Sequence, residues 1–303
     1  MDFTLTEAQR ELAALTRKIL DSSDSPWLDL VKSGVVPEQP DDFGVLEQCS
    51  VLIELGRAVS PVPYLPATVA ASALAEFGTP EQRERWLTPG TVLSVALAEA
   101  DGVKTTVPFA RTAAAFLVAQ DEQVFLVEPD QVEITAQELV DGSVAGSFEH
   151  SGGELVPGLS PGWLITRYTL GLCALQLGVT ERALELTAEY ARTRVQFDRP
   201  IGSFQAVAQR LADAYIDVAA IRLTLWQAAW RLSEGLDASE EVATAKFWAA
   251  DAGHRVAHTA VHVHGGTGID MSHEVHRYFT AAKRNEFELG GATAQLLKLS
   301  AAW

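Results

Sequence analysis

The residues from Ala188 to Asp213 read AEYARTRVQFDRPIGSFQAVAQRLAD, and two long helices meet within them. The first helix, which has apolar periodicity, ends here because Pro200 has no N–H group to donate and Gly202 follows it. Ser203 then begins the second helix as its N-cap. The sequence therefore predicts a short elbow between two helices.

The elbow is cationic and aromatic. Arg192, Arg194 and Arg199 surround Gln196 and Phe197, which are predicted to be exposed. Forked guanidinium groups beside an aromatic ring are typical of an anion site. The alternative is that the arginines form only ion pairs with acids of the chain itself: Glu189, Asp198 and Asp213.

The run RTRVQFDRPIGSFQAVAQRLAD resembles the signature of the acyl-CoA dehydrogenase family, where it lies in the C-terminal helical domain. Two further pieces agree in order and spacing, HVHGGTGID at 262–270 and RYFTAAKRNEFELGGATAQ at 277–295. The N-terminal MDFTLTEAQRELAALTRKIL is similar to the first helix of that family. The resemblance implies a mostly α fold, FAD as the cofactor and an acyl-CoA substrate.

By this resemblance, the elbow contacts the diphosphate and adenosine parts of an FAD that belongs to the adjacent subunit. The Gly-rich turn would form a second wall, because glycine lets a backbone approach a ligand closely. The predicted cofactor-binding residues are Arg194, Gln196, Phe197, Gln205, His262, Gly265 and Gly266.

The catalytic base of the family is a Glu immediately before a Gly, and the resemblance places Leu289 and Gly290 there. Glu288 and Glu286 lie nearby, and either could be an ordinary surface acid at a helix end. The other base position in the family corresponds to residues 167–169, which read Arg-Tyr-Thr. We therefore assign no catalytic residue to this chain.

Three histidines that recur every four residues on one helix face could ligate a metal: His254, His258 and His262. Asp251 is the one nearby acid, and no Glu-x-x-His pair occurs in the sequence. We therefore predict no metal site. Cys49 and Cys173 lie in apolar helical patterns without metal-ligand spacing, and we expect both to be buried thiols.

The charge is unevenly distributed along the 303 residues. Residues 1–160 hold 9 basic and 25 acidic side chains, a net charge of −16, whereas residues 161–303 hold 14 and 15, a net charge of −1. The acidic part disfavours nucleic acid as a partner. No apolar run reaches the roughly 20 residues that a membrane span needs, so we expect a soluble, cytoplasmic protein.

Three regions follow from the periodicity: an N-terminal helical domain at 1–90, a truncated β-domain at 91–160 and a C-terminal helical bundle at 161–303. The predicted early helices are 3–21, 43–59, 68–77 and one that Thr79, Pro80 and Glu81 begin; the predicted strands are 92–98, 113–119, 124–127, 132–135 and 144–148. In the bundle, we expect helices at 164–194, from Ser203 to Gly235, and from a Ser239 cap to 263. The strands are too few and too short for the full flavin-supporting domain of the family.

We therefore expect a subunit that pairs with a full-length acyl-CoA dehydrogenase homologue and completes its FAD site without a base of its own. The resemblance extends to the heteromeric enzymes of actinobacterial steroid side-chain catabolism. Two alternatives remain open at this point: a self-sufficient homo-oligomeric FAD enzyme that uses Glu288, and a flavin-free scaffold subunit.

Overall fold

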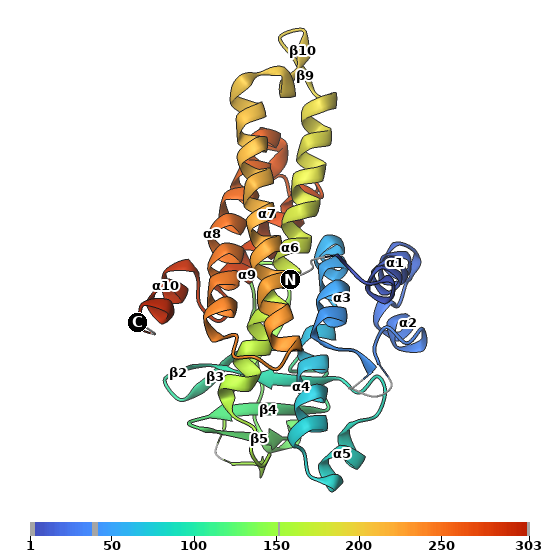
Figure 1. The fold of residues 1–303 in the computed structure, drawn as a ribbon, viewed down its shortest axis with the longest axis vertical. Coiled ribbons are helices and arrows are strands. Elements are labelled where there is room, and N and C mark those ends of the chain that lie inside the picture. Colours follow the sequence, from blue (N-terminus) through green and yellow to red (C-terminus); the bar gives the residue numbers. More distant parts are fainter. Residues whose placement is uncertain (1–3, 38–41, 151, 302–303) are drawn as a thin grey trace. The chain divides into compact units, whose positions relative to one another are not determined.

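The computed structural model describes residues 4–37, 42–150 and 152–301 (Figure 1). The chain forms two compact units, which we describe separately. The N-terminal unit comprises Leu5–Val51 and Pro61–Gly171, and the C-terminal unit comprises chiefly Leu52–Ser60 and Leu172–Trp303. The elements follow the predicted order of helices, strands and helices. The two predicted domain boundaries, at 90 and 160, stay predictions.

Short helices open the N-terminal unit: α1 Glu7–Ser22, α2 Pro26–Lys32, the first part of α3 Val45–Ala58, α4 Tyr64–Phe77 and α5 Pro80–Trp86. The predicted start of α5 is confirmed, since the Thr79 side chain accepts a hydrogen bond from the Gln82 N–H group and the Gln82 side-chain oxygen accepts one from the Thr79 N–H group. The predicted start of α4 at Thr68 is wrong. Helix α4 begins at Tyr64, because the first helical turn tolerates Pro66.

Two four-stranded sheets complete the N-terminal unit. The first has the order β1 (Leu93–Ala96), β4 (Ala115–Gln120), β5 (Gln123–Val127) and β8 (Glu154–Leu155); β1 and β4 are parallel and the other pairs antiparallel. The second is antiparallel, with the order β2 (Ala98–Ala100), β3 (Val103–Pro108), β7 (Val144–Glu149) and β6 (Thr135–Glu138).

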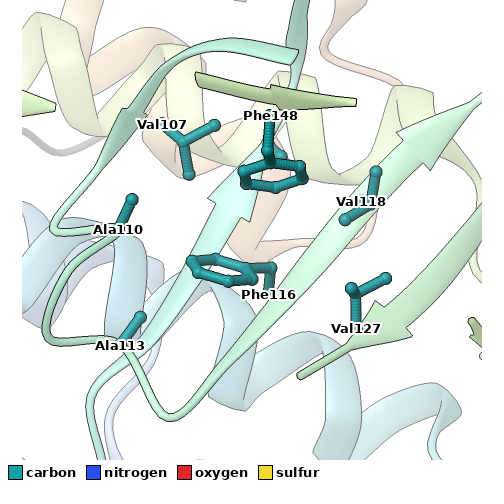
Figure 2. Close-up of a cluster of buried hydrophobic side chains, with 8 residues drawn as sticks. Val107, Ala110, Ala113, Phe116, Val118, Val127 and Phe148 are labelled. Carbon is teal, nitrogen blue, oxygen red and sulfur yellow. The ribbon is translucent and has the colours of Figure 1, made fainter. Parts of the chain in front are cut away.

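Figure 2 shows the apolar core that the strands enclose. Phe116 of β4 and Phe148 of β7 are both buried, and their ring centroids lie 5.1 Å apart. The sequence prediction missed β3 altogether, and the predicted strand at 132–135 is wrong because β6 begins at Thr135, after a 3-10 turn at Pro129–Gln131. Strands β3 and β6 pair with β7, one on each side of it. This pairing determines where the two strands lie, and the β-propensity of the local sequence does not predict it.

The C-terminal unit is a helical bundle. It contains the second part of α6 (Pro161–Thr193), then α7 (Gln205–Ser233), α8 (Ser239–His264), α9 (Val275–Phe287) and α10 (Ala292–Ala301). Helix α8 packs against α7, α9 and α10 (Figure 1). None of the described helices is long and apolar enough to cross a membrane.

Two predicted N-caps in this bundle are wrong. The Ser203 hydroxyl donates to the Pro200 carbonyl at 2.7 Å inside a 3-10 turn, and the N-cap of α7 is Phe204, without a side-chain cap bond. Ser239 is the first residue of α8, and its N–H group donates to the Asp237 carboxylate at 3.0 Å. The Asp237 carboxylate is a better acceptor for this N–H group than a serine hydroxyl, because the carboxylate is charged.

Glycines let α3 and α6 approach closely within the C-terminal unit. A Cβ atom on Gly178 of α6 would lie 2.0 Å from the carbonyl oxygen of Ile53. A Cβ atom on Gly56 of α3 would lie 2.1 Å from the carbonyl oxygen of Leu175. Both contacts are with backbone atoms, so the two helices must separate if either glycine gains a side chain.

Both cysteines are free and buried, as predicted. Cys49 lies in α3 and Cys173 in α6. Burial raises the pKa of the Cys173 thiol to about 12, which leaves it protonated and unreactive at neutral pH.

Candidate functional site

The predicted elbow is a β-hairpin. Strand β9 (Val195–Gln196) pairs antiparallel with β10 (Arg199–Pro200), and Phe197 and Asp198 between them both have left-handed backbone angles, with φ of 53° and 63°. Two left-handed residues in a two-residue loop are the geometry of a type I′ turn. A bulky residue is rare in this conformation, and such positions concentrate at functional sites.

Backbone hydrogen bonds attach the hairpin to α6. The Arg194 N–H group donates to the Tyr190 carbonyl at 2.8 Å, and the Arg194 carbonyl accepts from the Ile201 N–H group at 2.8 Å. The backbone of Arg194 is therefore held on both sides, and its side chain projects from an ordered base.

Phe197 presents its ring to the outside of the molecule, with 87% of its surface exposed. Its one ring contact among the described residues is an edge contact with Phe204, at a centroid distance of 6.2 Å. The Arg199 guanidinium lies 4.1 Å from the centroid of the Phe204 ring. The turn with left-handed backbone angles therefore holds the Phe197 ring in a largely solvent-exposed position.

The three arginines differ in their partners. Arg192 forms an ion pair with Glu189, and Arg199 stacks on Phe204. The Arg194 side chain forms no hydrogen bond or ion pair with the part of the chain that the structure describes. The alternative that these arginines only pair with acids of the chain thus applies to Arg192 and not to Arg194.

The Gly-rich turn follows α8 directly. Gly265 has φ of 62°, a conformation that side chains rarely adopt, and its N–H group donates to the carbonyls of His262 and Val261. A Cβ atom on Gly266 would meet no heavy atom within 4 Å, so packing within the chain does not require this glycine. Gly268 is different, because a Cβ atom there would lie 2.7 Å from the Val261 carbonyl oxygen.

The hairpin and the Gly-rich turn are joined through two rings that sequence reasoning missed. Tyr190, one turn before Arg194, stacks on His264 with ring centroids 4.3 Å apart. His264 immediately precedes Gly265. Gln205 begins α7 next to Phe204, and both Gln205 and His262 are exposed. All seven predicted cofactor residues are thus carried by the ends of α6 and α8, the start of α7 and the turns between.

The segment after α9 is tightly fixed. Leu289 has a left-handed φ of 57° and Gly290 has φ of 99°. Lys246 of α8 is fully buried and donates to the carbonyls of Asn285 and Glu286 (3.1 Å to the latter). The buried Gln295 amide donates to the carbonyls of Leu289 and Gly290 at 3.2 and 3.0 Å. The turn that carries Leu289 therefore has a specified conformation.

Two carboxylates flank this turn, and neither is an ordinary surface acid. The Glu286 carboxylate lies 3.1 Å from His254 Nδ1 and 2.8 Å from Lys283 Nζ, and its side chain is 12% exposed. The Glu288 carboxylate lies 3.4 Å from Arg284 Nε and is also 12% exposed. Of the possibilities left open for these acids, the ordinary surface acid fits neither, because basic residues of α8 and α9 pair with both.

The histidine row on α8 is engaged in other contacts. His254 and His258 have ring centroids 4.3 Å apart, and His254 Nδ1 lies beside Glu286. Burial, together with His254 and Lys283, lowers the pKa of His258. Across residues 4–37, 42–150 and 152–301, no group of three or more His, Cys, Asp or Glu side chains is placed to hold a metal ion.

This fold and these segments place the chain in a known class. The profile described as the acyl-CoA dehydrogenase C-terminal domain matches residues 164–302, and the N-terminal domain profile of the same family matches residues 33–91. The chain belongs to the acyl-CoA dehydrogenase family. Acyl-CoA dehydrogenases are flavoproteins, and FAD, which the sequence predicted, is confirmed as the cofactor of this family.

Individual relatives agree over nearly the whole chain. Acyl-CoA dehydrogenase FadE27 of Mycobacterium tuberculosis is 45% identical, with 99% of this chain and 98% of the relative covered. The crystal structure of the ChsE4-ChsE5 complex from Mycobacterium tuberculosis matches with a TM-score of 0.91 and 44% identity, over 99% of this chain and 98% of the matched chain.

A second solved structure, described as the Tcur3481-Tcur3483 steroid ACAD G363A variant, matches with a TM-score of 0.90 and 33% identity over 98% of both chains. These matches confirm the predicted fold class in its main features: mostly α and acyl-CoA dehydrogenase-like, with helical regions on either side of a β-region. The predicted reduction of the β-region stays a prediction.

Proposed function

We propose that this chain is a subunit of a heteromeric FAD-dependent acyl-CoA dehydrogenase and that it completes the FAD site of a full-length homologue. The observation that carries the proposal is the combination of an outward-facing Arg194–Phe197 hairpin with Leu289 in the turn where the family has its Glu. The chain would then supply cofactor contacts, and its partner would supply the chemistry.

The residues at the ends of α6 and α8 fit an FAD that approaches from outside the chain. The diphosphate carries two negative charges, and the Arg194 guanidinium is a forked donor without a hydrogen-bond partner among the described residues. Phe197 offers an exposed ring face, and Gly266 leaves its backbone open. Bound FAD supplies a hydride acceptor for Cβ of the acyl group. This chain's residues hold and orient it.

The α-proton of the acyl group needs a carboxylate, which we assign to the partner. Leu289 cannot accept a proton, and Glu286 and Glu288 are paired with basic side chains. At the family's other base position, Tyr168 and Thr169 are buried and Arg167 stacks 3.7 Å from the Trp163 ring centroid. Leu289, Tyr168 and Thr169 lack the carboxylate that proton abstraction requires, and the carboxylates of Glu286 and Glu288 are already engaged by basic groups.

An apolar helix face supports a protein partner. On α7, Tyr215, Ile216 and Leu223 are 67%, 65% and 57% exposed. Large apolar side chains gathered on one helix are uncommon on an isolated protein and mark interaction sites. One structural relative named above is the ChsE4-ChsE5 complex, which supports a homologous chain as the partner. The other is described as a steroid ACAD, which supports a steroid side chain as the first acyl group to test.

We expect assembly to control flavin content. Expressed alone, the chain should be poorly soluble or nearly colourless, because its α7 face is exposed and, in this proposal, it supplies only part of the FAD site. Co-expression with the full-length homologue should give a soluble complex with flavin absorbance. Size-exclusion chromatography with detection at the flavin band measures both, and the homologue expressed alone is the control. A yellow, active homo-oligomer of this chain would instead support the self-sufficient enzyme.

We expect Glu288→Gln to leave turnover of the complex within a few-fold of the parent, because its carboxylate is paired with Arg284 and is not the base. Loss of a true base costs about 10²–10⁴-fold. Dye reduction that depends on acyl-CoA measures turnover, and flavin absorbance controls for cofactor loss. If Glu288→Gln abolishes turnover while FAD stays bound, this chain carries the base.

The scaffold alternative predicts a third pattern. A subunit whose hairpin makes only interface contacts would join the complex but leave the flavin content unchanged when Arg194 is replaced. Flavin titration of the complex therefore separates the scaffold from the cofactor-binding subunit.

A further inference from the structure

His264 ends α8 with a ring that is buried between other rings. Its surface is 4% exposed, and its ring plane lies 24° from that of Tyr190 at a centroid distance of 4.3 Å. The ring of His273, in the segment that follows the Gly-rich turn, lies 5.3 Å away. His264 therefore contacts both the end of α6 and the chain beyond the turn.

The ring nitrogen nearest the helix is also engaged. His264 Nδ1 lies 2.8 Å from the Ala260 carbonyl oxygen, one turn earlier in α8. Burial is the main influence on the pKa of His264 and lowers it, His273 lowers it further, and Glu274 and the Ala260 carbonyl oppose them. The neutral ring with Nδ1–H directed at Ala260 satisfies this geometry.

The two rings come from α6 and α8, which also approach each other at a glycine. Lower in the bundle, a Cβ atom on Gly253 of α8 would lie 2.1 Å from the Gln176 amide nitrogen of α6, so the helices are in close contact there. At their ends, Tyr190 and His264 stand between the helices. Stacked rings keep a defined separation, because they resist compression and lose contact when they move apart.

Each ring is attached to one part of the proposed cofactor site. The backbone carbonyl of Tyr190 accepts the hydrogen bond of the Arg194 N–H group at 2.8 Å, and the backbone of His264 continues directly into Gly265. The stack therefore fixes the distance between the hairpin and the Gly-rich turn. A diphosphate held from both sides needs that distance to be constant.

We propose that His264 is a positioning residue, whose stack on Tyr190 sets the spacing between Arg194 and the Gly265–Gly266 turn and so sets the affinity for FAD. The inference rests on the proposed function, which assigns both segments to the cofactor. It assigns no contact with FAD to His264 itself, because the ring is buried within the chain.

The test is FAD titration of the cofactor-depleted complex with its full-length partner. His264→Ala removes the ring, and we expect FAD affinity to fall by about 10-fold. His264→Phe keeps a flat ring of similar size, and we expect affinity within about twofold of the parent. Val263→Ala is the matched control, because Val263 is the buried neighbour in α8 and its truncation loosens the core without touching the stack.

The outcomes separate the inference from the proposed function. Loss of affinity in His264→Ala with rescue in His264→Phe supports the inference. Unchanged affinity in His264→Ala, or an equal loss in Val263→Ala at equal urea midpoint, overturns it while the FAD site stands. A parent complex whose FAD content does not depend on this chain overturns the proposed function, and the inference with it.

Discussion

Replacing Arg194 with Ala should lower the FAD affinity of the assembled complex by roughly 10- to 150-fold. A charge-assisted hydrogen bond to the diphosphate contributes about 1.5–3 kcal/mol, and this range converts to that loss. The expected effect is large because hydrogen bonds to Tyr190 and Ile201 hold the Arg194 backbone, so its side chain loses little entropy on binding. Fluorescence titration with FAD down to limiting cofactor measures the affinity.

Arg192→Ala is the matched control for this measurement. Arg192 lies two residues away and is exposed, but it already pairs with Glu189. We expect its replacement to change FAD affinity by about twofold or less, because an exposed ion pair contributes little. Equal losses from both variants would show that only general positive charge matters, and unchanged affinity in Arg194→Ala would remove the hairpin from the cofactor site.

Gly178→Ala should be the most destabilising single substitution that we predict. The added Cβ atom would lie 2.0 Å from the Ile53 carbonyl oxygen, closer than any real contact, and a backbone atom cannot rotate away. Helices α3 and α6 must separate within the C-terminal unit, which costs the packing of neighbouring core residues. We expect a loss of about 3 kcal/mol or more in the free energy of unfolding, measured by urea titration.

Gly266→Ala provides the comparison. Its Cβ atom would meet nothing within 4 Å, so we expect the urea midpoint to stay close to that of the parent. Because the same glycine lies in the proposed cofactor wall, its FAD affinity should fall even though its stability does not. A Gly178→Ala variant as stable as Gly266→Ala would mean that α3 and α6 do not pack as described.

Local signals predicted the helices best. The start at Thr79-Pro80-Glu81 and the end of the preceding helix at residue 77, just before Gly78, were correct because caps act within one turn of chain. Ser203 and Ser239 are not N-caps because each has another hydrogen-bond partner nearby. Ser203 bonds to the Pro200 carbonyl, and Ser239 bonds to the Asp237 carboxylate. Residue type alone does not decide which acceptor or donor a serine finds.

Most of the features that the sequence did not predict depend on pairing between residues far apart in the chain. Strand β3 carries Lys104 and Pro108 and resembles a loop until β2 and β7 pair with it. The hairpin at Phe197 was predicted as an elbow because neither turn residue is glycine. In the candidate site, Arg194 and the Gly-rich turn could be predicted from their motifs. The Tyr190–His264 stack that links them could not, because it joins residues from two different helices.

The FAD content of the purified complex tests the central claim most directly. We expect one FAD for each pair of this chain and its full-length partner, because in the proposed arrangement the two chains share a single FAD site. Flavin absorbance after denaturation, set against quantitative amino-acid analysis, gives the ratio. A ratio of one that falls on Arg194→Ala agrees with the account. Two FAD for each pair, or flavin retained by this chain alone, would contradict it.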